Sequence, residues 1–181
     1  MNVKKIRLRK ALKFLGLLIS AMVIAAVSAQ VYSYMYITGT AEATTTGLRW
    51  VAGADAPSGT TISGGTVSSL AMKTNEGNER NYTDCLRIEN LDVAESHNFM
   101  LNVTSSTGNT SNWQEFNLVL FNNSSAQVAV LDILTQDANV TGLTIPAAVQ
   151  WGILFELIPI SNPETGQQIV FTVKLTYESV A

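Results

Sequence analysis

Side chains that commonly carry catalysis are sparse in this sequence and do not form a known motif. The chain has one histidine, His97, and one cysteine, Cys85. A Ser-His-Asp triad draws its members from distant positions, but the G-x-S-x-G nucleophile motif is absent. A single cysteine excludes an intramolecular disulfide, a cysteine-based zinc site and an iron–sulfur cluster. We therefore predict that the protein is not an enzyme and that His97 is structural or solvated.

Glycine and acidic residues do not supply a cofactor motif either. Gly59, Gly64 and Gly65 lie in a Ser/Thr-rich stretch without a Walker lysine, so they are interpreted as turn residues. Acidic residues gather within 84–95 and 132–137, which makes a surface calcium site a secondary alternative, but the spacing of a calcium-binding loop is absent. The sequence therefore predicts no cofactor and no metal.

Asparagine is the residue type for which modification chemistry is expected. The chain has six Asn-x-Ser/Thr sequons, where roughly two or three would arise by chance at this composition. Four of them fall in predicted turns, where a glycan is tolerated. The alternative is that Asn, Ser and Thr simply form a solvated β-surface and its turns. The N-glycosylation candidates are Asn81, Asn102, Asn109, Asn122, Asn123 and Asn139.

Basic residues are concentrated at the N-terminus. Six of the eleven lie within the first thirteen positions, which contain no acidic residue. The remaining chain has five basic residues against fourteen acidic ones, a net charge of −9. A surface of this charge repels nucleic acid and anionic lipid, so we do not expect nucleic acid as a partner.

An apolar run, FLGLLISAMVIAAV at residues 14–27, follows the basic cluster. Its length suits the apolar region of a signal peptide, and small residues up to Ala29 offer a cleavage site before Gln30. We therefore predict a signal peptide or signal-anchor helix over residues 1–29. In both cases the basic cluster stays in the cytoplasm and the rest of the chain is exported to the cell surface or the extracellular space.

Retention of the N-terminal segment is the alternative to cleavage. No charged residue occurs from residue 14 to residue 41, and three nearby tyrosines suit a membrane interface. The membrane is then a partner through the retained helix as well as during export. A pilin-type leader, which is cut before the apolar helix, fits the residues 10–13 (KALK) poorly.

From residue 30 onward, hydrophobicity alternates with a period of two. Short segments rich in Val, Ile, Thr, Leu and aromatic residues recur between clusters of Gly, Asn, Ser and Pro, which is typical of a sandwich or barrel. We predict one all-β domain over 42–181, a jelly-roll-like or immunoglobulin-like antiparallel β-sandwich. The last two strands are expected to pair as a C-terminal hairpin. The predicted strands cover 65–73, 83–91, 98–105, 113–121, 127–134, 141–145, 151–158 and 169–178.

The segment 30–41, which cleavage would place at the N-terminus, is apolar on both faces of a strand. One face carries Tyr32, Tyr34 and Tyr36, and the other carries Val31, Met35 and Ile37. A terminal strand of this kind needs burial on both sides. It could be a donor strand for a neighbouring subunit, a central strand of its own domain, or a continuation of a membrane helix.

This layout resembles the TasA/camelysin family of surface and biofilm-fibre subunits and the related archaeal bundling-pilus and thread subunits. The resemblance rests on the signal peptide, the apolar segment 30–41, the Thr-rich step at 43–50 (ATTTGLRW) and the C-terminal strands 151–158 and 169–178. It implies a jelly-roll-like sandwich whose N-terminal strand completes the next subunit. The sequence departs from the family at residues 32–36, and no residue supports a metal-dependent protease.

The first functional hypothesis is a secreted structural subunit that polymerises with itself, head to tail, by donor-strand addition into a pilus, thread or matrix fibre. Glycans are expected in its turns. One alternative is a membrane-anchored envelope protein associated with a surface layer. The other is a ligand- or carbohydrate-binding sandwich, suggested by Trp50, Trp113 and Trp151, because exposed aromatic rings stack on sugars.

Overall fold

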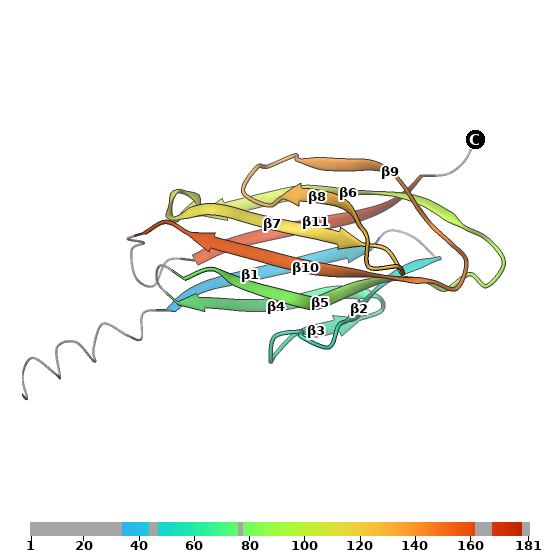
Figure 1. Cartoon of the computed structure of the whole chain (residues 1–181), viewed down its shortest axis with the longest axis horizontal. Helices are drawn as coiled ribbons and strands as arrows, with labels where there is room; N and C mark the ends of the chain where they lie inside the picture. The colour runs from blue at the N-terminus through green and yellow to red at the C-terminus, as the bar shows by residue number, and fades with distance from the viewer. Residues whose placement is uncertain (1–33, 44–46, 76–77, 162–167, 179–181) are drawn as a thin grey trace, which may run out of the picture. The chain divides into compact units, whose positions relative to one another are not determined.

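The computed structural model describes residues 34–43, 47–75, 78–161 and 168–178 (Figure 1). Within these residues the chain is all-β and forms two sheets that pack against each other, as the sequence predicts. Among the described residues, the other regular element is one 3-10 turn, η2 (Thr110–Asn112). The described part contains no helix that is long and apolar enough to cross a membrane. The predicted signal or anchor helix at 1–29 lies outside the described residues.

The first sheet, called the β1 sheet, has six strands. In spatial order they are β3 (Thr61–Ser63), β4 (Thr66–Asn75), β1 (Tyr34–Ala43), β11 (Gln168–Glu178), β6 (His97–Gly108) and β9 (Asn139–Ile145). The second, called the β10 sheet, has five strands and lies in front in Figure 1. Its order is β2 (Leu48–Ala52), β5 (Arg80–Asn90), β10 (Gln150–Pro159), β7 (Trp113–Phe121) and β8 (Gln127–Asp132).

The core lies between the two sheets and follows the period-two pattern of the sequence. Alternate residues of β10 and β11 are buried, as predicted for both strands: Trp151, Ile153, Phe155 and Leu157 in β10, and Ile169, Phe171, Val173 and Leu175 in β11. Phe116, Phe155 and Phe171 meet across the sandwich with ring centroids 5.2 to 6.0 Å apart. Aromatic contacts of this kind add to the apolar burial that stabilises the two layers.

The predicted C-terminal hairpin is wrong. β10 pairs with β5 and β7 in one sheet, whereas β11 pairs with β1 and β6 in the other. Each strand carries a full apolar face, and the two faces cover the core from opposite sides. The chain between them therefore crosses from one sheet to the other. Among the described strands, β1 and β11 are also the one parallel pair, an exception to the antiparallel pattern that was predicted.

Candidate functional site: the β1 seam

β1 occupies a central position in its sheet. It pairs antiparallel with β4 on one side and parallel with β11 on the other. In the described sheet, β1 is the strand that joins the pair β3–β4 to the group β11–β6–β9. We call the place between β4 and β11 that β1 fills the β1 seam. Its location means that the backbone donors and acceptors of β4 and β11 that face β1 depend on this strand for their partners.

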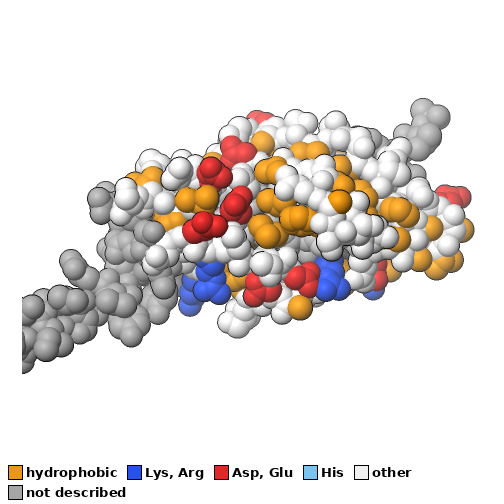
Figure 2. All heavy atoms as spheres, viewed as in Figure 1, with side chains coloured by type: hydrophobic (Ala, Val, Ile, Leu, Met, Phe, Trp, Pro, Cys, Tyr) orange, Lys and Arg blue, Asp and Glu red, His pale blue; other side chains and the backbone are white. Residues whose placement is uncertain are grey.

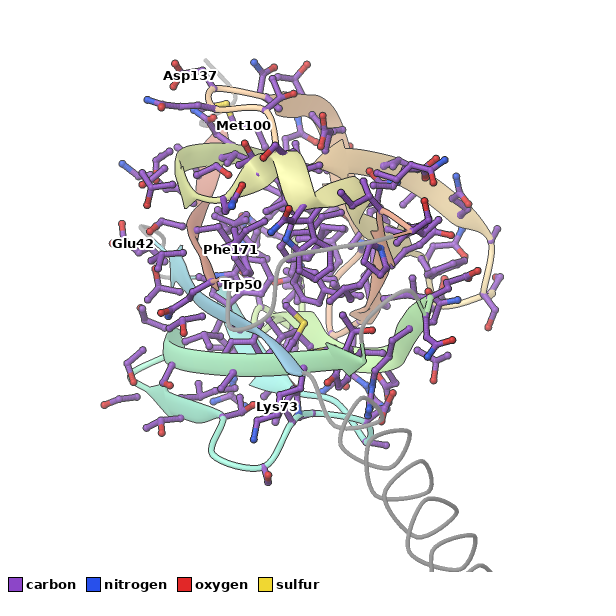
Figure 3. All side chains as sticks on the ribbon, turned by 90° about the vertical axis from the view of Figure 1, so that its left-hand side faces the viewer. Glu42, Trp50, Lys73, Met100, Asp137 and Phe171 are labelled. Carbon is purple, nitrogen blue, oxygen red and sulfur yellow. The ribbon has the colours of Figure 1, made fainter. Side chains whose placement is uncertain are left out.

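The inward face of β1 carries small residues where the seam meets the aromatic core. Gly39 is buried and lies level with Leu70 and Phe171. A Cβ atom at Gly39 would lie only 2.2 Å from Cζ of Phe171, so the Phe171 ring occupies the space that a larger residue would need. Ala41, which is 3 % exposed, continues this face. Figure 3 shows Phe171 among the packed interior side chains, with Glu42 at the periphery.

From Thr38 to Glu42, the outward face of β1 is polar, and side-chain hydrogen bonds fix it to β11. The Thr40 hydroxyl donates to the Thr172 hydroxyl at 3.0 Å, and Gln168 Nε2 donates to the Thr38 hydroxyl oxygen at 2.8 Å. Because a slip of one residue would exchange the two faces of the strand, these bonds and the buried glycine define the register together.

A buried tryptophan of the other sheet also holds β1. Trp50 in β2 is fully buried, and its indole Nε1 donates to the backbone oxygen of Glu42 at 3.1 Å. This bond satisfies the one polar atom of a large core side chain. The end of β1 is thus anchored to both layers of the sandwich.

Four of the predicted donor-strand residues lie within β1, namely Tyr34, Met35, Tyr36 and Ile37. Ile37 lies level with Met72 and Ile169, both fully buried. The alternative prediction, in which a membrane helix continues through Ile37, is therefore wrong for the residues from Tyr34 onward, because they form a strand. The other two donor-strand residues, Val31 and Tyr32, and the predicted cleavage site at Ala29 and Gln30 lie outside the described residues.

The sequence did not identify Gly39 as a functional position. Its signal is a glycine inside an apolar, Thr-rich strand, which often marks a bulge or a close approach. The structure has both features, since the pairing with β4 shifts register between Gly39 and Ala41.

The six sequons differ in accessibility. Asn81, Asn123 and Asn139 are exposed, and Asn109 and Asn122 are half-buried beside turns. The Ser111 hydroxyl donates to Oδ1 of Asn109 at 2.6 Å within that sequon. Asn102 differs, because its Oδ1 is buried in the middle of β6. All six stay predictions.

The three tryptophans do not form a sugar-binding surface. Trp50, Trp113 and Trp151 are all buried, with at most 7 % exposed. The tryptophan-based prediction of a carbohydrate site is therefore wrong. His97 is 8 % exposed, and its Nε2 lies 3.7 Å from Oδ2 of Asp92. Among the described residues, no group of His, Cys, Asp or Glu is placed to hold a metal ion.

Two members of the acidic cluster at 84–95 are paired with arginines. Arg87 donates two hydrogen bonds to Asp84, of 2.9 and 2.6 Å, and Arg49 donates to Glu89. The hydrogen bond from Arg87 is the main cause of the lowered pKa of Asp84. These carboxylates are committed to local structure, which leaves them unsuited to a calcium site.

No protein-family model matches the chain, and a search of curated proteins found no match to its sequence.

Cys85 is expected to be unreactive in the folded protein. Its side chain is fully buried, and burial raises the pKa of the thiol to about 12, so the thiolate that reacts with alkylating agents is almost absent at neutral pH. Iodoacetamide should modify the guanidinium-denatured chain but not the native one, as measured by intact mass. Val170→Cys, at a position that is 43 % exposed, is the reactive control. Rapid modification of native Cys85 would contradict this prediction.

Proposed function

We propose that the protein is an exported structural subunit that polymerises by β-strand addition, with β1 of one subunit completing the β1 seam of the next. The observation that carries the proposal is the central place of an N-terminal strand that pairs on both sides with strands far from it in sequence. The proposal includes a jelly-roll-like form of the sandwich and an N-terminal signal or anchor helix at 1–29. The same export would expose the sequons to glycosylation.

The chemistry of the seam supports strand addition. Without β1, β4 and β11 would each lose their backbone hydrogen-bond partners on the side that faces β1, and apolar residues such as Met72 and Phe171 would lose part of their cover. Unpaired buried backbone groups and exposed apolar surface are both costly. A β1 strand from another copy offers the same backbone bonds and the same small inward face.

An exchange of this kind gives an open polymer. The donated strand and the accepting seam are different surfaces of the subunit, so each contact is heterologous and leaves one free strand and one free seam at the two ends. Head-to-tail growth into a thread or fibre follows. The partner in this proposal is another copy of the chain.

One observation favours a second candidate. In the single chain, β1 completes its own domain, which suits a self-contained envelope protein held at the surface by a retained N-terminal helix. The two candidates differ in which chain supplies β1. That difference can be measured directly.

A cysteine pair across the seam should identify the chain that supplies β1. The hydroxyl oxygens of Thr40 and Thr172 are 3.0 Å apart, so Thr40→Cys with Thr172→Cys places two sulfurs within bonding reach. In fibres purified under oxidising conditions, we expect a ladder of covalent oligomers on a non-reducing denaturing gel, which collapses to monomer on reduction. Each single variant is the control, since Cys85 is buried. Fibres that yield only cross-linked monomer would overturn the proposal and favour the envelope protein.

A further inference from the structure

The outer face of the β10 sheet contains a slot above Gly152. Trp151 and Ile153 point into the core, so Gly152 lies on the opposite, outer face. A Cβ atom at Gly152 would meet no atom within 4 Å, which means that the space above this residue is open. Gly152 lies level with Arg87 of β5 on one side and with Phe121 of β7 on the other. Two strand spacings separate these walls by about 10 Å.

The slot is lined by both polar and apolar side chains. We call Arg87 and Gln150 its polar half; Phe121 and Leu154 supply its apolar surface, beside the polar residues Asn122, Asn123 and Ser125. Figure 2 shows this face of the molecule, on which apolar side chains gather beside charged ones. Because β10 is paired on both sides here, a ligand would lie on side chains and could not add as a strand.

Hydrogen bonds hold the polar half in place. Asp84 lies where β5 departs from regular pairing with β10, and it accepts two hydrogen bonds from Arg87. Arg87 Nη1 donates to Gln150 Oε1 at 3.3 Å, and Gln150 Nε2 donates to Glu89 at 2.8 Å. Among the described residues, these bonds use three of the five N–H groups of the Arg87 guanidinium. Two N–H groups therefore remain for a ligand.

The charges around the slot cancel. Arg87 is paired with Asp84, and Arg49 is paired with Glu89. An anionic ligand would gain no net attraction from a neutral set of this kind. A suitable ligand is uncharged. It has hydroxyl groups that can hydrogen-bond to Arg87 and Gln150, and it has an apolar face that can pack on the ring of Phe121.

We propose that the Gly152 slot binds a neutral saccharide, with sugar hydroxyls on Arg87 and Gln150 and the apolar face of the ring on Phe121. Two sources are available. Asn122 and Asn123, both in sequons, line the same slot, so the saccharide can be a glycan of this protein. It can equally be a polysaccharide of the surroundings. This inference does not depend on strand exchange, because the slot lies on the sheet that does not contain β1.

Two variants change the slot with little risk to the fold. Gly152→Val fills it, and valine is favoured in strands, so we expect the melting temperature to stay unchanged. Phe121→Leu removes the aromatic ring and keeps an apolar side chain. Ser124→Ala with Ser125→Gly removes both sequons and leaves Asn122 and Asn123 in place. Glycine suits position 125, where φ is 59°.

The test measures binding of neutral hexasaccharides of glucose, mannose, galactose and N-acetylglucosamine to the full exported chain by saturation-transfer NMR. We expect at least one to bind, with affinity about tenfold lower, or 1.4 kcal/mol, in Gly152→Val and reduced in Phe121→Leu. Binding that appears only in the Ser124→Ala, Ser125→Gly variant identifies the protein's own glycan as the occupant. Equal binding to both forms identifies an external polysaccharide.

Three results would overturn the saccharide site. They are failure of all four hexasaccharides to bind either form, binding that Gly152→Val leaves unchanged, and binding of a heparin hexasaccharide with none of the neutral ones. The last result would assign the slot to anions. The cysteine-pair experiment tests strand exchange at the β1 seam, whereas this one tests saccharide binding at the outer face of the β10 sheet. Either proposal can therefore fail without the other.

Discussion

Gly39→Val is expected to abolish fibre growth. A Cβ atom at this position would lie 2.2 Å from the Phe171 ring, so valine cannot enter the seam unless the ring or the strand moves. Overpacking of a core costs about 1–3 kcal/mol, and a domain of this size loses roughly 2–4 °C of melting temperature for each kcal/mol. The same clash arises whether β1 comes from its own chain or from another. Electron microscopy of the purified protein and a thermal melt measure the two effects.

Gly152→Val is the matched control for this change. It is the same substitution in a central strand of the other sheet, at a site where an added Cβ atom meets nothing within 4 Å. It should leave fibres and melting temperature unaltered. A companion variant that combines Gly39→Val with Phe171→Leu should recover part of the lost stability, because the two positions are in direct contact and their effects are not additive. Normal fibres from Gly39→Val alone would contradict the seam geometry.

A free β1 peptide is expected to restore a domain that lacks its own β1. A chain without residues 1–43 should melt at least 10 °C lower than the full chain, roughly what a loss of several kcal/mol implies. The peptide YMYITGTAEA, which reproduces Tyr34–Ala43, should bind the vacant seam and raise the melting temperature. At one hundred times its dissociation constant the peptide contributes about 2.7 kcal/mol. Differential scanning calorimetry against peptide concentration measures this.

The peptide with Gly39→Val is the control and should give no rise in melting temperature. Added to growing fibres of the full chain, the unmodified peptide should also stop elongation, since it fills the seam at the fibre end without supplying a new one. A truncated chain that is as stable as the full chain would show that the seam does not need β1. A peptide that stabilises the domain but leaves elongation unchanged would separate folding from assembly and remove strand addition as the mechanism.

Alternation of apolar and polar residues was enough to predict the inward faces of the last two strands. Phe155 and Phe171 belong to unbroken period-two runs, and both are buried. Their pairing was not predictable in this way, because two strands with equally apolar faces can lie in one sheet or face each other across a core. A short polar connection such as the one between β10 and β11 usually favours a hairpin. Here the two strands lie in different sheets instead, and their apolar faces cover the core from both sides.

The contacts that define the seam and the slot depend on residues far apart in sequence. Gly39 and Phe171 are separated by nearly the whole domain, and only the parallel pairing of β1 with β11 places the ring over the glycine. The slot similarly needs Arg87, Gly152 and Phe121 from three strands in one register. The two apolar faces of the segment 30–41 were enough to predict a donor-type strand. The importance of Gly39 within it could not be predicted, because it depends on contacts with other strands.

The fit of β1 in its own domain has a consequence for how assembly would start. A strand attached to its own domain competes for the seam at an effective concentration in the millimolar range, which a separate subunit rarely reaches. Each exchange breaks and reforms the same backbone bonds, so contact energy favours neither outcome. The closed subunit is then a storage form, and fibres should begin only where a seam is already open. In the proposed assembly, at a given amount of protein, the rate of growth should therefore rise with the number of open ends.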